Sequence, residues 1–113
     1  MQYLLLIYGD EGQKDPAILQ EITAAHMRLG AEMAEAGAMA GGNRLKPSET
    51  ATTVRTVGGV QSLHDGPYAE TREQLAGYYM VEAPDLDAAI AWAKKIPGGP
   101  DYAIEVRPVW SMP

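Results

Sequence analysis

The chain has 113 residues, of which 46% are hydrophobic and 21% charged, and these values are typical of a single folded domain over residues 1–113. A formal net charge of −6 argues against nucleic acid or an anionic membrane as the main partner, because both require a basic surface. The absence of cysteine excludes disulfides and thiolate chemistry. The apolar run at residues 3–8 is too short for a signal peptide or a membrane span, so we expect a soluble, cytoplasmic protein.

The first third of the chain predicts a strand, a long helix and a weaker strand. Residues 3–8 are an apolar run rich in strand formers. Asp15 followed by Pro16 is typical of a helix start, and apolar residues then recur on one face. The members of this stripe are Ile18, Ile22, Ala25, Leu29 and Met33. Gly37 suits the left-handed residue that ends a helix, and residues 38–45 are the weaker strand candidate.

The middle of the chain predicts a β-hairpin. Residues 51–57 are rich in β-branched side chains, residues 60–63 form a second short run, and Gly58-Gly59 lies between them. Two glycines supply the positive φ angles that a tight hairpin turn requires. The turn at residues 65–68 follows directly, because Asp, Gly and Pro each favour turns.

The last third predicts a strand at 76–83, a helix at 85–96 and a half-buried strand at 102–109. Pro108 near the end of the last strand indicates an edge or terminal position. The resulting order is that of an α+β protein with the ferredoxin-like split βαβ pattern and an extra hairpin.

The first strand also predicts a partner. Apolar residues lie on both faces of it: Tyr3, Leu5 and Ile7 on one, and Leu4, Leu6 and Tyr8 on the other. Two helices can cover only one face of the sheet. A second copy of the sheet would cover the other face, so we expect a homodimer with a barrel-like interior. The alternative is that this face tolerates water through its tyrosine rings.

His26 is the first candidate for chemistry, because it lies at the margin of the apolar stripe, where small shifts move its pKa across neutrality. The alternative is a packing histidine that donates one hydrogen bond to a carbonyl. Two histidines and scattered carboxylates match no metal-ligand spacing, and there is no phosphate-loop or dinucleotide-binding motif. We therefore expect neither a metal nor a cofactor.

Residues 65–74, which we call the DGPY segment, concentrate a turn, carboxylates, a hydroxyl and an arginine between two strands. Taken alone, they favour a long polar connection with a capping Thr71 and a solvated run of charges. The sequence Asp65-Gly66-Pro67-Tyr68-Ala69-Glu70-Thr71-Arg72-Glu73 nevertheless resembles the D-G-P-F-A-E-T-K-E motif of the DGPF group in the YCII-related domain family. Tyr68 replaces Phe and Arg72 replaces Lys, so ring and charge are kept. The similarity continues at residues 1–9, 45–47, 51–55, 84–87, 91–93 and 105–109.

The resemblance implies a dimeric α+β barrel of ferredoxin-like subunits. In the YCII branch a His–Asp pair in a cleft has been suggested as catalytic; His26 is similar to that branch's helix histidine, and Asp65 is the motif carboxylate. Some DGPF members are linked to extracytoplasmic-function sigma factors, which implies a possible regulatory partner.

Two functions follow as expectations. The first is a small-molecule enzyme in which Asp65 orients His26, and the free ring nitrogen of His26 moves a proton. Tyr68 would supply a hydroxyl or a ring wall, and Glu70 with Arg72 or Arg55 would orient an acidic or polar ligand. The alternative is a non-catalytic ligand-binding or regulatory module that uses the same segment.

Overall fold

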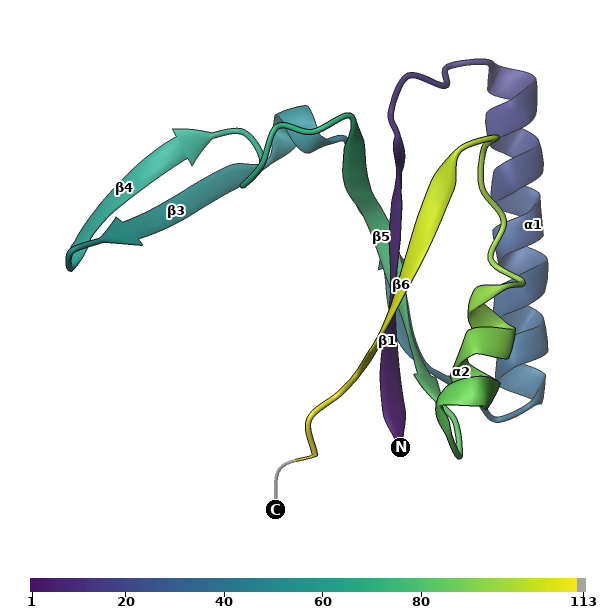
Figure 1. The fold of residues 1–113 in the computed structure, drawn as a ribbon. Helices are drawn as coiled ribbons and strands as arrows, with labels where there is room; N and C mark the ends of the chain where they lie inside the picture. The colour runs from purple at the N-terminus through teal and green to yellow at the C-terminus, as the bar shows by residue number, and fades with distance from the viewer. Residues whose placement is uncertain (112–113) are drawn as a thin grey trace.

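The computed structural model describes residues 1–111 and has the predicted elements in the predicted order (Figure 1). They are β1 (Gln2–Asp10), α1 (Pro16–Glu35), β2 (Met39–Arg44), the short 3-10 helix η1 (Ser48–Thr50), β3 (Thr52–Val57), β4 (Val60–Asp65), β5 (Glu73–Glu82), α2 (Leu86–Ala93) and β6 (Tyr102–Pro108). Sequence patterns did not predict η1. Within the described range, no helix is long and apolar enough to cross a membrane.

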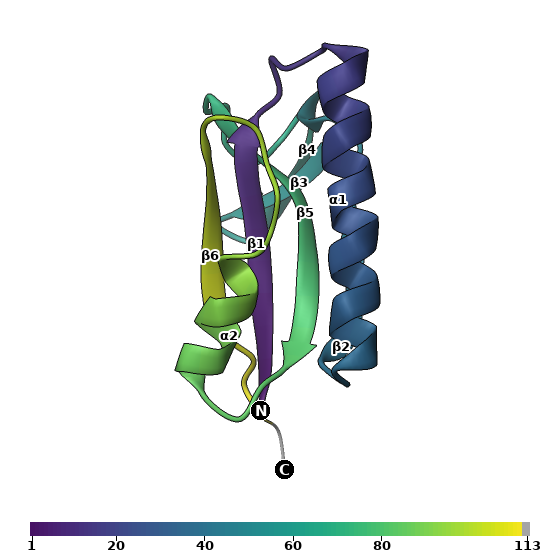
Figure 2. The ribbon, with the colours of Figure 1, turned by 90° about the vertical axis from the view of Figure 1, so that its right-hand side faces the viewer.

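Four antiparallel strands form the main sheet in the order β2-β5-β1-β6, and β3 pairs with β4 in a separate hairpin. Both α-helices cover the same face of the main sheet (Figures 1 and 2). This is the predicted ferredoxin-like α+β fold with an extra hairpin. The edge position of β6 agrees with Pro108 at its end, since proline cannot donate to a neighbouring strand.

Local signals placed the helix boundaries well at three of four ends. The Asp15 carboxylate accepts a hydrogen bond from the Ala17 amide at 2.9 Å, and Gly37 has a φ of 72° after the last turn of α1. The Asp85 carboxylate likewise accepts from the amide of Ala88 at 2.9 Å. The predicted end of the second helix at residue 96 is wrong, because α2 stops at Ala93 and the chain then turns.

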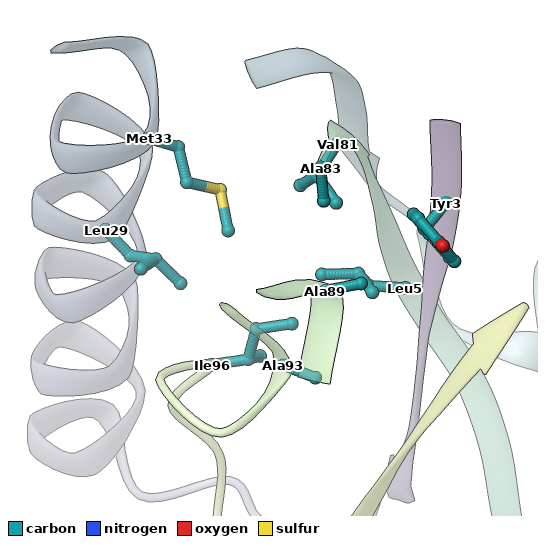
Figure 3. Close-up of a cluster of buried hydrophobic side chains, with 9 residues drawn as sticks. All are labelled: Tyr3, Leu5, Leu29, Met33, Val81, Ala83, Ala89, Ala93 and Ile96. Atoms are coloured by element: carbon teal, nitrogen blue, oxygen red, sulfur yellow. The ribbon is translucent and has the colours of Figure 1, made fainter. Parts of the chain in front are cut away.

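The core lies between the helices and the covered face of the sheet (Figure 3). Its buried members are Tyr3, Leu5, Leu29, Met33, Val81, Ala83, Ala89, Ala93 and Ile96. The predicted stripe of α1 contributes Leu29 and Met33, whereas Ile18 at its other end is 37% exposed. The reason is that the short α2 lies beside only one part of α1, leaving the first turns of α1 less covered (Figure 2).

The other face of the sheet, which we call the open face, is also apolar. Its register pairs Leu4 with Met80, Leu6 with Tyr78, and Tyr8 with Leu75, and all six side chains are only half-buried. Neither α1 nor α2 lies on this face of the sheet (Figure 1). Glu105 and Arg107 of β6 form an ion pair beside them, in register with Leu6 and Leu4.

The hairpin projects away from the sheet on the side of the open face (Figures 1 and 2). Gly58 and Gly59 have φ angles of 57° and 80°, which confirms the predicted turn. All six residues of β4 are exposed to solvent. Val54 and Leu63, which pair across the hairpin, are 59% and 76% exposed. The arm therefore has almost no packing of its own against the rest of the chain.

Candidate functional site

The DGPY segment begins where the hairpin joins the sheet. The Gly66 amide donates to the Ala51 carbonyl at 2.8 Å, and the Thr53 hydroxyl donates to the Gly66 carbonyl at 2.8 Å. Gly66 has a φ of 136°, and a Cβ atom there would lie 3.0 Å from Nε2 of His64. Glycine at this position therefore allows the chain to turn sharply while staying bonded to the start of β3.

Gln74 holds the rest of the segment in shape. Its Nε2 amide donates to the carbonyls of Ala69 at 2.9 Å and of Thr71 at 2.8 Å. The Thr71 hydroxyl in turn donates to the Glu73 carbonyl at 2.6 Å. These bonds tie the loop onto the first residues of β5, so the segment is an ordered turn rather than a loose connection.

Residues 45–51 form the facing wall. The Leu45 amide donates to the Ala76 carbonyl of β5 at 2.9 Å. Both carboxylate oxygens of Glu11 accept bonds from Ser48, one from its amide and one from its hydroxyl, each at 2.7 Å. The loop after β1 thus fixes η1, and with it the second wall.

Between the two walls lie two adjoining hollows of about 520 Å³ and 470 Å³. They share Ser48, Pro67, Thr71 and Gln74, so we treat them as one space and call it the DGPY cleft. The larger hollow is lined partly by polar side chains, including Lys46 and Glu73, and partly by apolar and aromatic ones, among them Tyr8, Leu45, Pro47, Tyr68 and Leu75. The smaller one is lined by the carboxylates Glu49, Asp65 and Glu70.

Two of the four predicted ligand-binding residues line this cleft, and so does Asp65, which was predicted as catalytic. Asp65 and Glu70 line the smaller hollow and Tyr68 the larger one. Arg55 of β3 lies over the Tyr68 ring, with its guanidinium carbon 5.3 Å from the ring centroid. The hairpin and the DGPY segment are therefore in contact beyond the turn itself.

Arg72 has a different environment. Its Nε donates to Oδ2 of Asp10 at 2.9 Å, at the end of β1. This bond and the Gly12 amide lower the pKa of the Asp10 carboxyl. The guanidinium is thus engaged in an exposed ion pair and does not line either hollow.

His26 lies on α1, on the covered side of the sheet, and its partner is Tyr79 of β5. The ring Nδ1 is 2.6 Å from the Tyr79 hydroxyl, and the two rings stack with centroids 5.8 Å apart. Burial lowers the pKa of His26 most; the carbonyl of Pro97 acts in the opposite direction, and the charge of Arg44 lowers the pKa further. These effects favour a neutral ring whose Nδ1 accepts the hydrogen bond of the Tyr79 hydroxyl.

Within one chain, the structure does not bring His26 and Asp65 together. α1 lies on one side of the main sheet, whereas β4, which ends at Asp65, lies on the other (Figures 1 and 2). The contact expected between them is not formed, because the sheet separates their elements. His26 has the environment of the packing histidine that the sequence left as the alternative.

Sequence reasoning missed several residues of the cleft. Ser48, Glu49 and Gln74 line it, and Nε2 of His64 lies 3.9 Å from Oε1 of Glu70 at its rim. No local pattern identifies Ser48 or Glu49, since they meet the DGPY segment only through the tertiary fold. Among residues 1–111, no three potential metal ligands gather at one place.

Comparison with known proteins places these features in one family. The model of the YCII-related domain matches residues 1–113. An uncharacterised protein of Rhizobium meliloti (strain 1021) is 32% identical over 120 residues, which cover 96% of this chain and 92% of that protein. With the ferredoxin-like fold and the DGPY turn described above, these similarities show that the chain belongs to the YCII-related domain family.

Proposed function

We propose that this protein binds a small molecule in the DGPY cleft. The observation that carries the proposal is the larger hollow of about 520 Å³, formed by two ordered walls. This volume falls in the range of roughly 300–1,000 Å³ that is typical of small-molecule sites. The hydrogen bonds of Gln74, Thr71 and Ser48 support the proposal, because they hold both walls in place before any ligand arrives.

The lining favours a ligand of mixed character. Tyr68 and Leu75 offer an apolar wall in the larger hollow, whereas Asp65 and Glu70 offer hydrogen-bond acceptors in the smaller one. Such a cleft suits a molecule with an apolar body and a head that donates hydrogen bonds, such as a hydroxyl or an amine. A carboxylate head is disfavoured in the smaller hollow, because the carboxylates of Glu49, Asp65 and Glu70 line it.

A homodimer is part of the proposal. The chain exposes 8046 Å² of surface. A folded monomer of this mass exposes about 6,000 Å², and a stable dimer removes about 800 Å² from each partner. The excess surface supports a large interface, and the open face and the projecting hairpin are where the unpaired apolar side chains gather. We propose that a second copy covers these side chains, because in a two-fold dimer the same apolar surface of each copy covers that of the other.

General acid–base catalysis is the second candidate, and the pair of carboxylates in the smaller hollow favours it. Asp65 and Glu70 lie there with His64 at the rim, so a bound molecule would have proton acceptors within reach. Asp65 would act as the base in this proposal, instead of orienting His26 as the sequence predicted. His26 would serve as the packing partner of Tyr79 instead.

A ligand screen with a matched pair of variants tests the binding site. Ala69 is exposed and lines the larger hollow, while Ala31 is exposed on α1 on the covered side of the sheet. We expect compounds that raise the melting temperature of the wild type to do the same for Ala31→Trp and to lose their effect on Ala69→Trp, whose indole fills the hollow. Equal binding by both variants would place the ligand elsewhere and reject the proposed site.

A further inference from the structure

We propose that the DGPY cleft lies between two subunits, so that the second copy covering the open face supplies the wall that one chain leaves missing. This inference rests on the ligand-binding homodimer proposed above. Its starting point is that Tyr8 and Leu75 belong to both surfaces. They line the larger hollow, and they face each other across β1 and β5 as the last apolar pair of the open face.

Distances along the sheet make the overlap unavoidable. Tyr8 lies two residues beyond Leu6 on β1, or about 7 Å along the strand. An interface of standard size covers about 800 Å² on each partner, which is roughly 30 Å across and as long as a strand of nine residues. A partner centred on Leu4 and Leu6 therefore reaches the end of β1 where the cleft opens.

The hairpin brings the partner to the other flank of the cleft as well. It projects on the side of the open face (Figure 1), and Thr53 and Asp65 at its base line the two hollows. Val54 and Leu63 of the hairpin are 59% and 76% exposed and remain to be covered. The cleft thus lies where the open face meets the base of the projecting hairpin.

A site between subunits has a regulatory consequence. A ligand that touches both copies binds the dimer more tightly than the single chain, and the same free energy must then strengthen the dimer. The chain would be most strongly associated when its ligand is abundant. Ligand entry would occur through the gap between copies, which admits small molecules and excludes large ones.

Thiol labelling tests this geometry, because the chain contains no cysteine and a single substitution creates a unique thiol. Ala69→Cys places the thiol in the larger hollow, and Ala31→Cys is the matched exposed control on α1. Each folded variant is treated with a small reagent, methyl methanethiosulfonate, and with a maleimide carried on a long polyethylene glycol chain. Both rates are divided by the rates in denaturant, and the mass of each variant is measured by sedimentation.

We expect the polymer reagent to label Ala69→Cys slower than Ala31→Cys by roughly an order of magnitude or more, while the small reagent labels both alike. Adding Leu4→Asp to the open face should restore the polymer rate as the dimer dissociates. Equal polymer rates in a dimer would overturn the intersubunit cleft and leave ligand binding intact. If neither reagent labels Ala69→Cys, the partner seals the cleft, and the proposed ligand site itself is rejected. If the protein sediments as a monomer, the proposed dimer is rejected.

Discussion

The partners of a side chain decide its role more than its position on a helix does. His26 lies at the margin of the apolar stripe of α1, where a catalytic and a packing role are equally compatible with the sequence. The hydroxyl of Tyr79, 53 residues away, settles the geometry, because at 2.6 Å it engages Nδ1 of the ring. Arg44 adds a positive charge that disfavours the protonated ring. The environment is thus that of a neutral, bonded imidazole.

This environment predicts a pH dependence of stability. The folded chain lowers the pKa of His26, chiefly through burial, whereas the unfolded chain returns it to about the ordinary value of 6.5. As the pH falls below this value, the unfolded state gains a proton that the folded state resists, so the free energy of unfolding decreases. Asp10, with its lowered pKa, acts in a separate window below 3.8.

Urea unfolding at a series of pH values between about 7.5 and 5 measures this effect. The wild type should lose stability over that interval, and His26→Gln, which keeps a polar side chain but cannot titrate, should lose less. Identical slopes for the two proteins would contradict the assignment of His26 as a buried, neutral ring.

At the scale of elements, local chemistry was predictable and tertiary placement was not. Gly58-Gly59 between β-branched residues identified the hairpin, and Asp15 and Asp85 identified the helix starts, because each signal acts within a few residues. The direction of the hairpin could not be predicted from the sequence, since its side chains contact the rest of the chain only near its base, as Thr53 does with Gly66 and Arg55 with Tyr68. The wall at residues 45–51 was missed because the bonds that position it, to Glu11, Gly66 and Ala76, all come from residues distant in sequence.

The DGPY turn predicts a position that tolerates only glycine. Gly66 has a φ of 136°, which a side chain strongly disfavours, and its Cβ would crowd His64. Gly66→Val should therefore destabilise the fold by more than about 1 kcal/mol and weaken any ligand bound in the cleft. Gly99→Ala is the control, because its Cβ would meet no atom within 4 Å and its φ is not in the left-handed region. Melting curves that show equal losses for both variants would mean that the turn does not depend on this glycine.

At the scale of the whole molecule, the chain is less compact than is typical of a domain of its length. Its radius of gyration is 15.8 Å, compared with about 13 Å for a compact domain of this length. The buried core lies entirely on the covered face, so half of the main sheet and the whole hairpin contribute nothing to it. Association with a second copy would remove apolar side chains of the open face and the hairpin from water. It would also place the DGPY cleft at an interface.

The open face therefore predicts that one charge should separate the subunits. Wild-type protein at micromolar concentration should sediment with twice the 12.2 kDa mass of the chain. Leu6→Asp, at the centre of the open face, should give a monomer or a strongly weakened dimer, because a carboxylate buried without a partner costs several kcal/mol. Met27→Asp is the matched control, since Met27 is 72% exposed on α1 on the opposite side and should leave the dimer intact. A wild type that sediments as a single chain would contradict the proposed dimer. The apolar second face of β1 would then need another explanation.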